Sequence, residues 1–229
     1  MSMVSIGFDE VVYPESDGLP MAEGEEQGEV IRTLFPGYRH LYRDAEDVHV
    51  AGDMFWYPDR GNTRAVLAPD VMVIDGCRRD QNLSSYLPWD HAGNAPRLVI
   101  EVVSPSNKPT EMLDKLAFYD RHGVEEYIYI DPFEHQIRAW VRGGGALVTQ
   151  LVPDSWTSVT SGVIFAFVNE AFVATGPDGR RWLRAEDELA RAEAEAARAE
   201  SEAARADRAE AEAARLREEL DRLRASASE

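Results

Sequence analysis

The sequence has one cysteine, Cys77, and no long apolar run. A single cysteine excludes an internal disulfide. No stretch approaches the roughly 18 consecutive apolar residues that a membrane-spanning helix needs. The first residues also lack the basic start and the apolar run of a secretory signal peptide. We therefore expect a cytoplasmic protein that does not enter a membrane.

Lysine is scarce, and the charge is strongly negative. Lys108 and Lys115 are the only two lysines, and the formal net charge is -18. This composition argues against a general nucleic-acid coat protein, because phosphate binding depends on Lys and Arg. The acidic excess is concentrated at two ends, however: residues 1–30 hold eight acidic and no basic side chains, and residues 185–229 hold fourteen acidic against eight basic. The region between them is nearly balanced, so bound divalent cations could make a carboxylate-lined cleft acceptable to phosphate.

Residues 185–229 lack aromatic residues, glycine and proline, and consist mostly of Ala, Glu and Arg. Such a segment cannot form a globular core by itself, so we predict a globular domain over 1–184 and a long helix over 185–229. Apolar residues recur at seven-residue spacing in two columns, which are Ala192, Ala199, Ala206, Ala213 and Leu220, and then Ala209, Leu216 and Leu223. This pattern predicts a coiled coil and a homodimer. The alternative is a single solvated helix stabilised by Glu–Arg pairs.

Apolar periodicity and turn-forming residues predict the elements of the globular part. We expect a short helix near 21–27 and a helical stretch over 28–41 that Pro36 and Gly37 interrupt. Strands are predicted at 47–57, 66–74, 98–103, 126–131 and 162–168, a helix at 110–122, and a hairpin from 136–142 and 146–152. The order of these elements indicates an α/β or α+β domain built on one mixed sheet.

Two carboxylates stand within the most apolar predicted strands. Asp70 lies in the run VLAPDVMVI, and Glu101 lies in LVIEVV. A lone charge on a core strand costs several kcal/mol unless it is paired or bound to a metal. One carboxylate on each of two adjacent strands can surround a single cation. Mg²⁺ and Mn²⁺ prefer such oxygen ligands and retain waters, one of which can become a nucleophile.

Several ordered motifs resemble a large bacterial family of restriction-endonuclease-like proteins within the PD-(D/E)XK superfamily. They are APDVMVID (68–75), the residues Ser85, Tyr86 and Trp89, the block APRLVIEVVSPS (95–106), the pair Asp114-Lys115 with Tyr119, and GVEEYIYIDP (123–132). The segment YPESDGLPMAE (13–23) and the Ala/Glu-rich tail match one branch of that family. The resemblance implies a restriction-endonuclease-like fold, with a central mixed sheet flanked by helices, and metal-dependent hydrolysis of phosphodiester bonds, most simply in DNA.

The resemblance also implies roles for particular residues. Asp70 matches the aspartate of the PD motif, and Glu101 matches its second acidic position; the backbone carbonyl of Val102 would complete the metal ligands. The third element departs from the family, because Val103 stands where a lysine is expected. Lys115 is the first candidate to replace that lysine. Lys108 is the second choice.

Glu23, within the family-like segment, is a candidate for a further metal ligand, or else one acidic loop residue among many. Each assignment has a structural alternative. Asp70 could accept hydrogen bonds from backbone at a strand end, Glu101 could pair with Arg97 or Lys115, and Lys115 could be an exposed helix residue. Tyr86 and Trp89 are expected to pack rather than to contact substrate.

The five histidines and Cys77 show no metal-binding or nucleophile pattern and receive no catalytic role. At the level of the whole protein, the alternative to a nuclease is a non-catalytic binding module that keeps the fold and recruits partners through its tail. Hydrolysis of a substrate other than nucleic acid by paired carboxylates is a third possibility.

Overall fold

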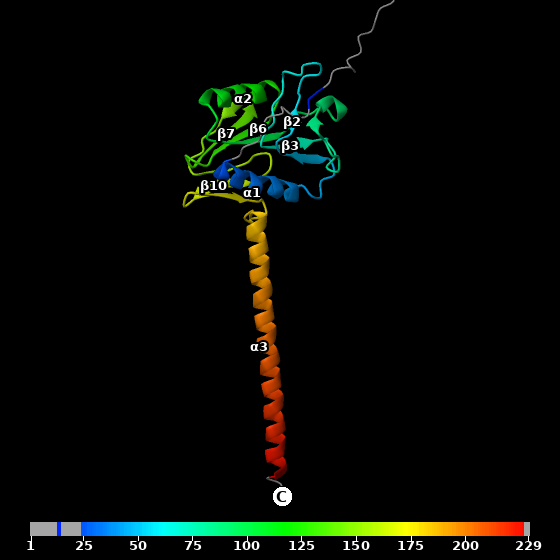
Figure 1. The fold of residues 1–229 in the computed structure, drawn as a ribbon, viewed down its shortest axis with the longest axis vertical. Coiled ribbons are helices and arrows are strands. Elements are labelled where there is room, and N and C mark those ends of the chain that lie inside the picture. The colour runs from blue at the N-terminus through cyan, green and yellow to red at the C-terminus, as the bar shows by residue number, and fades with distance from the viewer. Residues whose placement is uncertain (1–12, 15–23, 227–229) are drawn as a thin grey trace, which may run out of the picture. The chain divides into compact units, whose positions relative to one another are not determined.

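The computed structural model describes residues 13–14 and 24–226, and its centre is a six-stranded mixed sheet (Figure 1). The strands follow the order β1-β3-β5-β6-β7-β8. Their bounds are β1 Val48–Ala51, β3 Val71–Asp75, β5 Leu98–Val102, β6 Glu126–Asp131, β7 Gln136–Gly143 and β8 Ala146–Thr149. Neighbouring strands are antiparallel except β5 and β6, which are parallel. The predicted mixed central sheet is therefore confirmed.

Two smaller sheets accompany the central one. The first is antiparallel, in the order β11-β10-β9, with β9 Ser155–Thr157, β10 Ile164–Val168 and β11 Ala171–Thr175. The second is a parallel pair of β2 Phe55–Trp56 with β4 Ser85–Tyr86, followed by the short 3-10 helix η2 Pro88–Asp90. Strands β4, β9 and β11 were not predicted. β4 and β9 are too short for a clear apolar alternation, and β9 and β11 are only partly buried.

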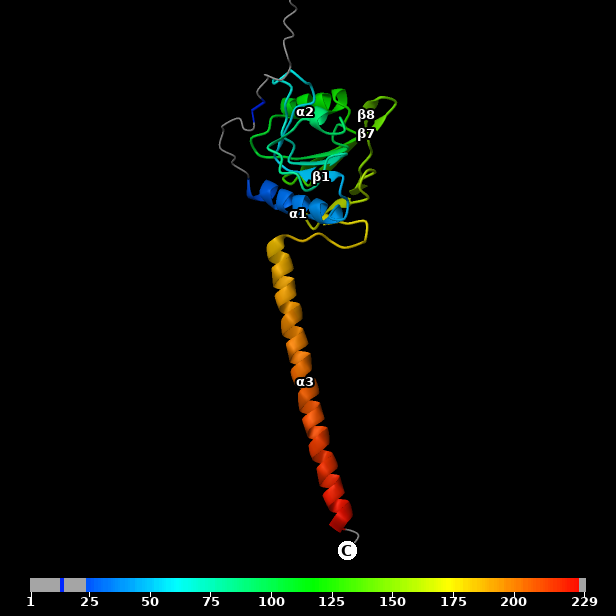
Figure 2. The same ribbon diagram turned by 90° about the vertical axis from the view of Figure 1, so that its right-hand side faces the viewer.

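Helices α1 (Glu25–Leu41) and α2 (Pro109–Arg121) pack against opposite faces of the central sheet. Because side chains alternate along a strand, β5 sends Leu98, Ile100 and Val102 toward α1 and the small β10 sheet, and sends Val99 toward α2. Figure 2 shows α1 below the sheet beside β1 and α2 above it. A strand buried on both faces explains why the run LVIEVV is almost continuously apolar.

Helix α1 is continuous through Pro36, which corrects the predicted interruption. A proline inside a helix removes one backbone hydrogen bond and usually breaks it. Tertiary packing outweighs that cost here: Leu34 and Tyr38 are fully buried on either side of the proline. A Cβ on Gly37 would lie 2.2 Å from the Trp182 ring, so only glycine lets that ring approach the helix. Of the predicted helix at 21–27, residues 21–23 lie outside the described part, and 25–27 belong to α1.

Two strand predictions need correction as well. The single strand predicted at 47–57 is two strands in different sheets, β1 and β2, separated by Asp53 at a φ of 50°. A positive φ ends extended structure, and Gly52-Asp53 is the turn-forming pair in the sequence at this point, which the prediction did not use. The strand predicted at 66–74 begins only at Val71, so Asp70 precedes β3 instead of lying inside it. The predictions at 98–103, 110–122 and 126–131 and the hairpin agree with the structure to within a few residues.

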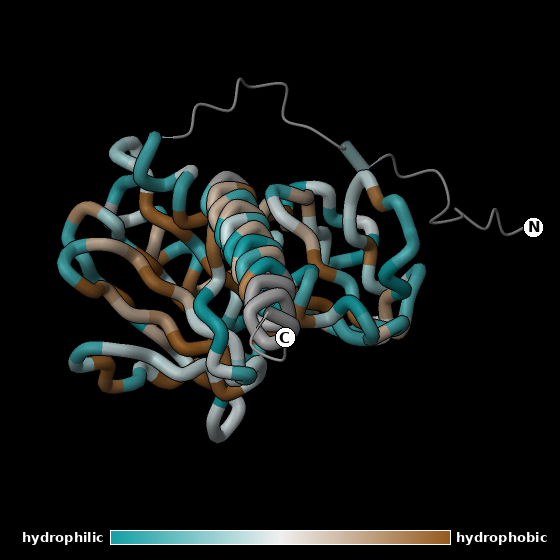
Figure 3. The backbone as a smooth tube through the Cα atoms, turned by 90° about the horizontal axis from the view of Figure 1, so that it is seen from below, coloured by the Kyte–Doolittle hydropathy of each residue, from teal (hydrophilic) through white to brown (hydrophobic). Residues whose placement is uncertain are grey.

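Contacts within the chain define two compact units, Met1–Trp182 and Leu183–Glu229. The second unit contains α3 (Ala185–Ser226), the predicted long helix, with 42 residues. Figure 3 shows apolar strands inside the first unit, whereas hydrophilic and apolar residues alternate along α3. Residues 189–212 are exposed in this single chain, and Leu216 is 57% exposed. The side chains of Leu220 and Leu223 lie outside the described ones, and the coiled coil stays a prediction.

Candidate active site

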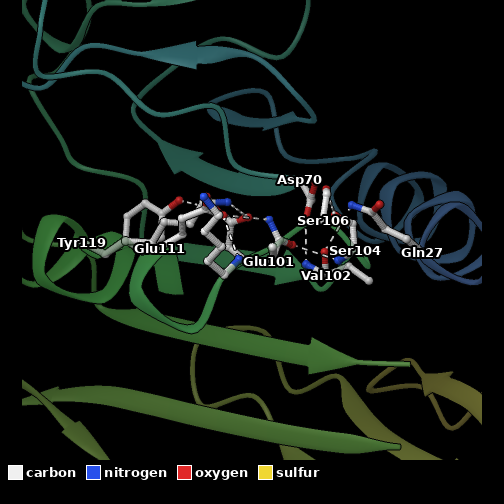
Figure 4. A network of polar contacts seen from close by, with 11 residues as sticks. Gln27, Asp70, Glu101, Val102, Ser104, Ser106, Glu111 and Tyr119 are labelled. Carbon is white, nitrogen blue, oxygen red and sulfur yellow. Dashed lines mark hydrogen bonds and ion pairs between the residues drawn. The ribbon is translucent and has the colours of Figure 1, made fainter. Parts of the chain in front are cut away.

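Glu101 is the acidic residue on the central strand β5 and is 3% exposed. Its Oε2 lies 2.6 Å from Nζ of Lys115, and its Oε1 accepts a hydrogen bond from the hydroxyl of Tyr119 (Figure 4). Lys115 and Tyr119 stand four positions apart on α2, so they project from the same face of that helix. Helix α2 therefore supplies both partners that make the burial of this carboxylate tolerable.

Asp70 lies across from Glu101 at the same end of the sheet. Val71 pairs with Ile100 in the antiparallel register, which places Asp70 opposite Glu101 and on the same face. Its Oδ2 accepts a hydrogen bond of 2.6 Å from the backbone N–H of Val102. The two carboxyl groups therefore lie close together where β3 begins and β5 ends.

The environment of Asp70 disfavours its negative charge. Burial, together with the nearby charge of Glu101, raises the pKa of Asp70 to about 8, although the Val102 N–H and Lys115 act in the opposite direction. A buried acid whose pKa is shifted by desolvation and a specific neighbour is a feature of functional sites. A cation at this point would remove the cause of the shift.

Lys115 is the lysine that reaches the carboxylates. Burial lowers its pKa, but the neighbouring Glu101 carboxylate more than offsets this effect, so the pKa of Lys115 is raised and the ammonium stays charged. Lys108 stands at the N-cap of α2 with an exposed side chain. Val103, at the position where the family has lysine, uses its backbone N–H to bind the carbonyl of Ile130 at 2.8 Å.

The carbonyl of Val102, predicted as a metal ligand, accepts a hydrogen bond of 3.2 Å from Nε2 of Gln27. Gln27 is 9% exposed and lies on α1. Gln27 was not predicted as a site residue. The feature of the sequence that could have identified it is its position in the apolar stripe of α1, which continues with Val30 and Leu34. A polar side chain at such a position needs a hydrogen-bond partner.

The segment that joins β5 to α2 is held by its own polar groups. Ser104 donates its backbone N–H to Oδ1 of Asn107 at 2.9 Å, and its hydroxyl lies 2.8 Å from that of Ser106. Oε2 of Glu111 accepts the backbone N–H of Lys108 at 3.1 Å, which fixes the start of α2 as a capping box does. These contacts set the position of α2, and with it the position of Lys115.

Of the acidic residues predicted for this site, Asp70 and Glu101 belong to the part of the chain that the structure describes. Glu23 lies outside the described residues. Within residues 13–14 and 24–226, no group of three or more His, Cys, Asp and Glu side chains could hold a metal ion. Among the described residues, Asp70, Glu101 and backbone oxygen could hold a metal at this site together with water. That all-oxygen set fits Mg²⁺ or Mn²⁺, which bind through one or two carboxylates and keep several waters.

Contacts expected from the structural alternatives also occur. Asp70 does bind backbone, and Glu101 does form an ion pair with Lys115. Arg97 instead pairs with Asp75 at 2.8 Å. Tyr86 is fully buried and donates to the carbonyl of Asn94 at 2.7 Å, as expected for a packing role.

Residues 18–169 match the Uma2 family, described as "Putative restriction endonuclease". No curated protein matches the chain. A solved structure described as a putative nuclease belonging to DUF820 from Anabaena variabilis is similar, with 16% identity and a TM-score of 0.48; the match covers 66% of this chain and 86% of the other. Among the described helices, none is long and apolar enough to cross a membrane.

Proposed function

Because the chain belongs to the Uma2 family of "putative restriction endonucleases", we propose that it is a nuclease that hydrolyses phosphodiester bonds in DNA with the help of Mg²⁺ or Mn²⁺. One observation carries the proposal. Asp70, directly before β3, lies close enough to Glu101 on the adjacent strand β5 for their charges to interact, and the ammonium of Lys115 is 2.6 Å from Glu101. A metal ion held by two carboxylates and a nearby ammonium are groups that stabilise negative charge on a reacting phosphate.

Asp70 and Glu101 would hold the metal ion, assisted by the carbonyl of Val102. Glu23 is proposed as a further ligand, directly or through water. Each of these donors is an oxygen, and the raised pKa of Asp70 reflects burial and the charge of Glu101, both of which a divalent cation would counter. When bound, the ion supplies a Lewis acid for the phosphate and lowers the pKa of a coordinated water.

The remaining residues position these groups. The Tyr119 hydroxyl and the Lys115 ammonium hold the two oxygens of Glu101, and the Val102 N–H holds one oxygen of Asp70. Lys115 would stabilise the additional negative charge that the phosphate gains in the transition state, in place of the lysine that Val103 replaces. Removing one such donor typically slows an enzyme by about 10²–10³-fold.

A non-catalytic module with the same fold is the second candidate. The observation that favours it is that both oxygens of Glu101 already have protein partners, so the buried charge is satisfied without a metal. In that case the helix α3 would carry the function by recruiting partners. We propose for either function that α3 makes the protein a homodimer, which would suit an enzyme that cuts two DNA strands.

A cleavage assay tests the proposal. The full-length protein is incubated with plasmid DNA, single-stranded DNA and RNA in Mg²⁺, Mn²⁺ or EDTA, beside Asp70→Ala, Glu101→Ala and the exposed control Glu134→Ala. We expect cleavage of DNA that requires metal, is lost in the first two variants and is retained in the control. Metal-dependent cleavage by Glu101→Ala at the wild-type rate would refute the assignment. Absence of both cleavage and metal binding in the wild type would favour the non-catalytic module.

A further inference from the structure

A cavity of about 680 Å³ lies along the free edge of β1. Among the strands of the described residues, β1 ends the central sheet and pairs only with β3. The cavity is walled by side chains of α1, by β1 itself and by residues 79–83. Its size lies within the range of about 300–1,000 Å³ that is typical of small-ligand sites.

One end of this cavity lies beside the backbone of Asp70. Gly52 lines the cavity, and a Cβ placed there would lie 3.0 Å from the carbonyl oxygen of Asp70 and 3.1 Å from the Phe35 ring. The next residue, Asp53, donates its N–H to the carbonyl of Pro69 at 2.9 Å. An extended ligand in the cavity would therefore end beside the backbone of Asp70.

The cavity is basic although the protein is acidic. Arg39 and Arg79 both line it and are exposed. Within the described part of the chain, neither forms an ion pair with a carboxylate. The guanidinium of Arg39 lies 5.7 Å from the centre of the Phe35 ring, and Arg79 donates to the carbonyl of Arg43. The one acidic residue in the lining, Asp80, is paired with Arg78 at 2.7 Å.

Two arginines without carboxylate partners on one cavity, in a chain of net charge -18, favour an anionic ligand. The cavity also offers flat rings, Phe35 and Tyr42, and the amide side chains of Gln81 and Asn82. Phosphates held by arginine, with bases placed against rings, are the features by which proteins bind single-stranded nucleic acid. Stacked and paired bases of a duplex do not enter a cavity of this size, whereas one or two unpaired nucleotides do.

We propose that this cavity binds single-stranded DNA next to the bond that is cut, with Arg39 and Arg79 holding its phosphates. This inference rests on the proposed nuclease function. It adds that the substrate is unpaired on the β1 side of Asp70, as in a single strand or an overhang.

The test separates binding from cleavage. Binding of a fluorescent 12-nucleotide single strand and of the matching blunt duplex is measured by anisotropy in EDTA, with full-length protein. The variant Arg39→Ala/Arg79→Ala is compared with Arg180→Ala/Arg191→Ala, which removes the same charge from residues that do not line the cavity. We expect tighter binding of the single strand, a loss of about 10-fold or more in the cavity variant, and little change in the control. Loss of two phosphate contacts should also lower the slope of log K against log salt by about 1.4.

Unchanged affinity in the cavity variant, an equal loss in the control, or tighter binding of the duplex would overturn the inference. Circular dichroism verifies that the variants fold. Cleavage of the same single strand in Mn²⁺ is measured in parallel. If the wild type binds the strand through the two arginines but cleaves nothing, the binding site stands and the nuclease proposal fails. If the protein cleaves the strand and the cavity variant binds and cleaves like the wild type, the nuclease stands and the cavity inference fails.

Discussion

The ammonium of Lys115 lies 2.6 Å from Oε2 of Glu101, although fourteen positions separate the two residues. The position two after Glu101, where the family pattern has lysine, is Val103. Helix α2 begins where Oε2 of Glu111 accepts the backbone N–H of Lys108, and this start brings the next turn of the helix over the end of β5. The lysine ammonium that β5 lacks at Val103 is therefore supplied by Lys115 of the neighbouring helix α2.

Replacing this lysine tests its two roles. We predict that Lys115→Met lowers the cleavage rate by about 10²–10³-fold, because the transition state loses a charged donor. It should also lower the free energy of unfolding by about 3–5 kcal/mol, because Glu101 is left buried without its cation. The rate is measured on single-stranded DNA in Mn²⁺, and the stability by urea denaturation.

The double variant Lys115→Met/Glu101→Gln serves as the control for stability. Removing both charges should restore much of the lost free energy of unfolding while leaving the protein inactive, since a neutral pair carries no unpaired buried charge. If Lys115→Met alone is as stable as the wild type, the ion pair does not stabilise the fold. If it is also as active, Lys115 has no part in the reaction.

The raised pKa of Asp70 predicts a pH-dependent stability of the metal-free protein. The folded state holds the proton up to about pH 8, whereas the unfolded chain releases it near the ordinary value of about 3.9. Between these values the folded state binds more protons, so its stability falls as the pH rises. We expect the wild type to lose stability relative to Asp70→Asn from about pH 4 to pH 8, by about 1 kcal/mol per pH unit, and no further above that range.

Urea denaturation in EDTA across this pH range provides the measurement. The asparagine variant has no titrating group at this position, so the difference between the two proteins isolates the contribution of Asp70. Saturating Mg²⁺ should make the pH dependence weaker, since a cation favours the ionised carboxylate. A difference that does not change with pH would show that Asp70 titrates normally.

Glu126 shows that a carboxylate on a core strand does not always mark a site. It is fully buried at the start of β6, beside Leu98. Five donors saturate its two oxygens: Trp156 Nε1, Ser158 Oγ, the backbone N–H of Val159, and the backbone N–H and hydroxyl of Thr160. Glu126 therefore anchors the segment that follows β9 to the central sheet.

We predict that Glu126→Ala lowers the free energy of unfolding by about 3–5 kcal/mol, because several buried donors lose their acceptor. Glu126→Gln should cost less, about 1–3 kcal/mol, because one acceptor oxygen remains. Neither variant should change the affinity for Mn²⁺ in the folded protein, since Glu126 lies toward the opposite end of β5 from Glu101. Denaturant unfolding and calorimetry test both statements; a loss of metal affinity in Glu126→Gln would assign it to the site instead.

The tail can be tested by removal. A chain that ends at residue 184 should remain folded, because the central sheet and both of its cores belong to the unit Met1–Trp182. If α3 forms a coiled coil, sedimentation velocity should show a dimer for the full chain and a monomer for the truncated one. A truncated chain that unfolds would refute the domain boundary, and a full chain that is monomeric at all concentrations would refute the coiled coil.

The central strands and α2 could be predicted from the sequence because their signals are local. The runs at 98–103 and 126–131 are apolar and bounded by turn formers, and Gly123 marks the end of α2. The interruption at Pro36 was predicted wrongly, because the packing that outweighs it comes from Trp182, far along the chain. Local propensity does not contain such a contact.

For the site, sequence patterns identified Asp70 and Glu101 because each carboxylate interrupts an apolar strand. The same rule does not separate Glu101 from Glu126. The difference lies in their partners: one lysine and one tyrosine for Glu101, and five donors from β9 and the segment after it for Glu126. Gln27 was missed because its partner is a backbone carbonyl, which no residue pattern encodes. Such partners become visible only when the strands and helices are placed in space.

The proposed nuclease activity depends most on a metal bound between Asp70 and Glu101. Isothermal titration of the full-length protein with Mn²⁺ at neutral pH, beside Asp70→Asn and the exposed control Glu134→Gln, measures this directly. We predict one site per chain in the wild type and in the control, and a loss of binding of at least about 10-fold in Asp70→Asn, as a coordinating group is removed. No binding to the wild type at millimolar Mn²⁺, or equal binding to Asp70→Asn, would contradict the account.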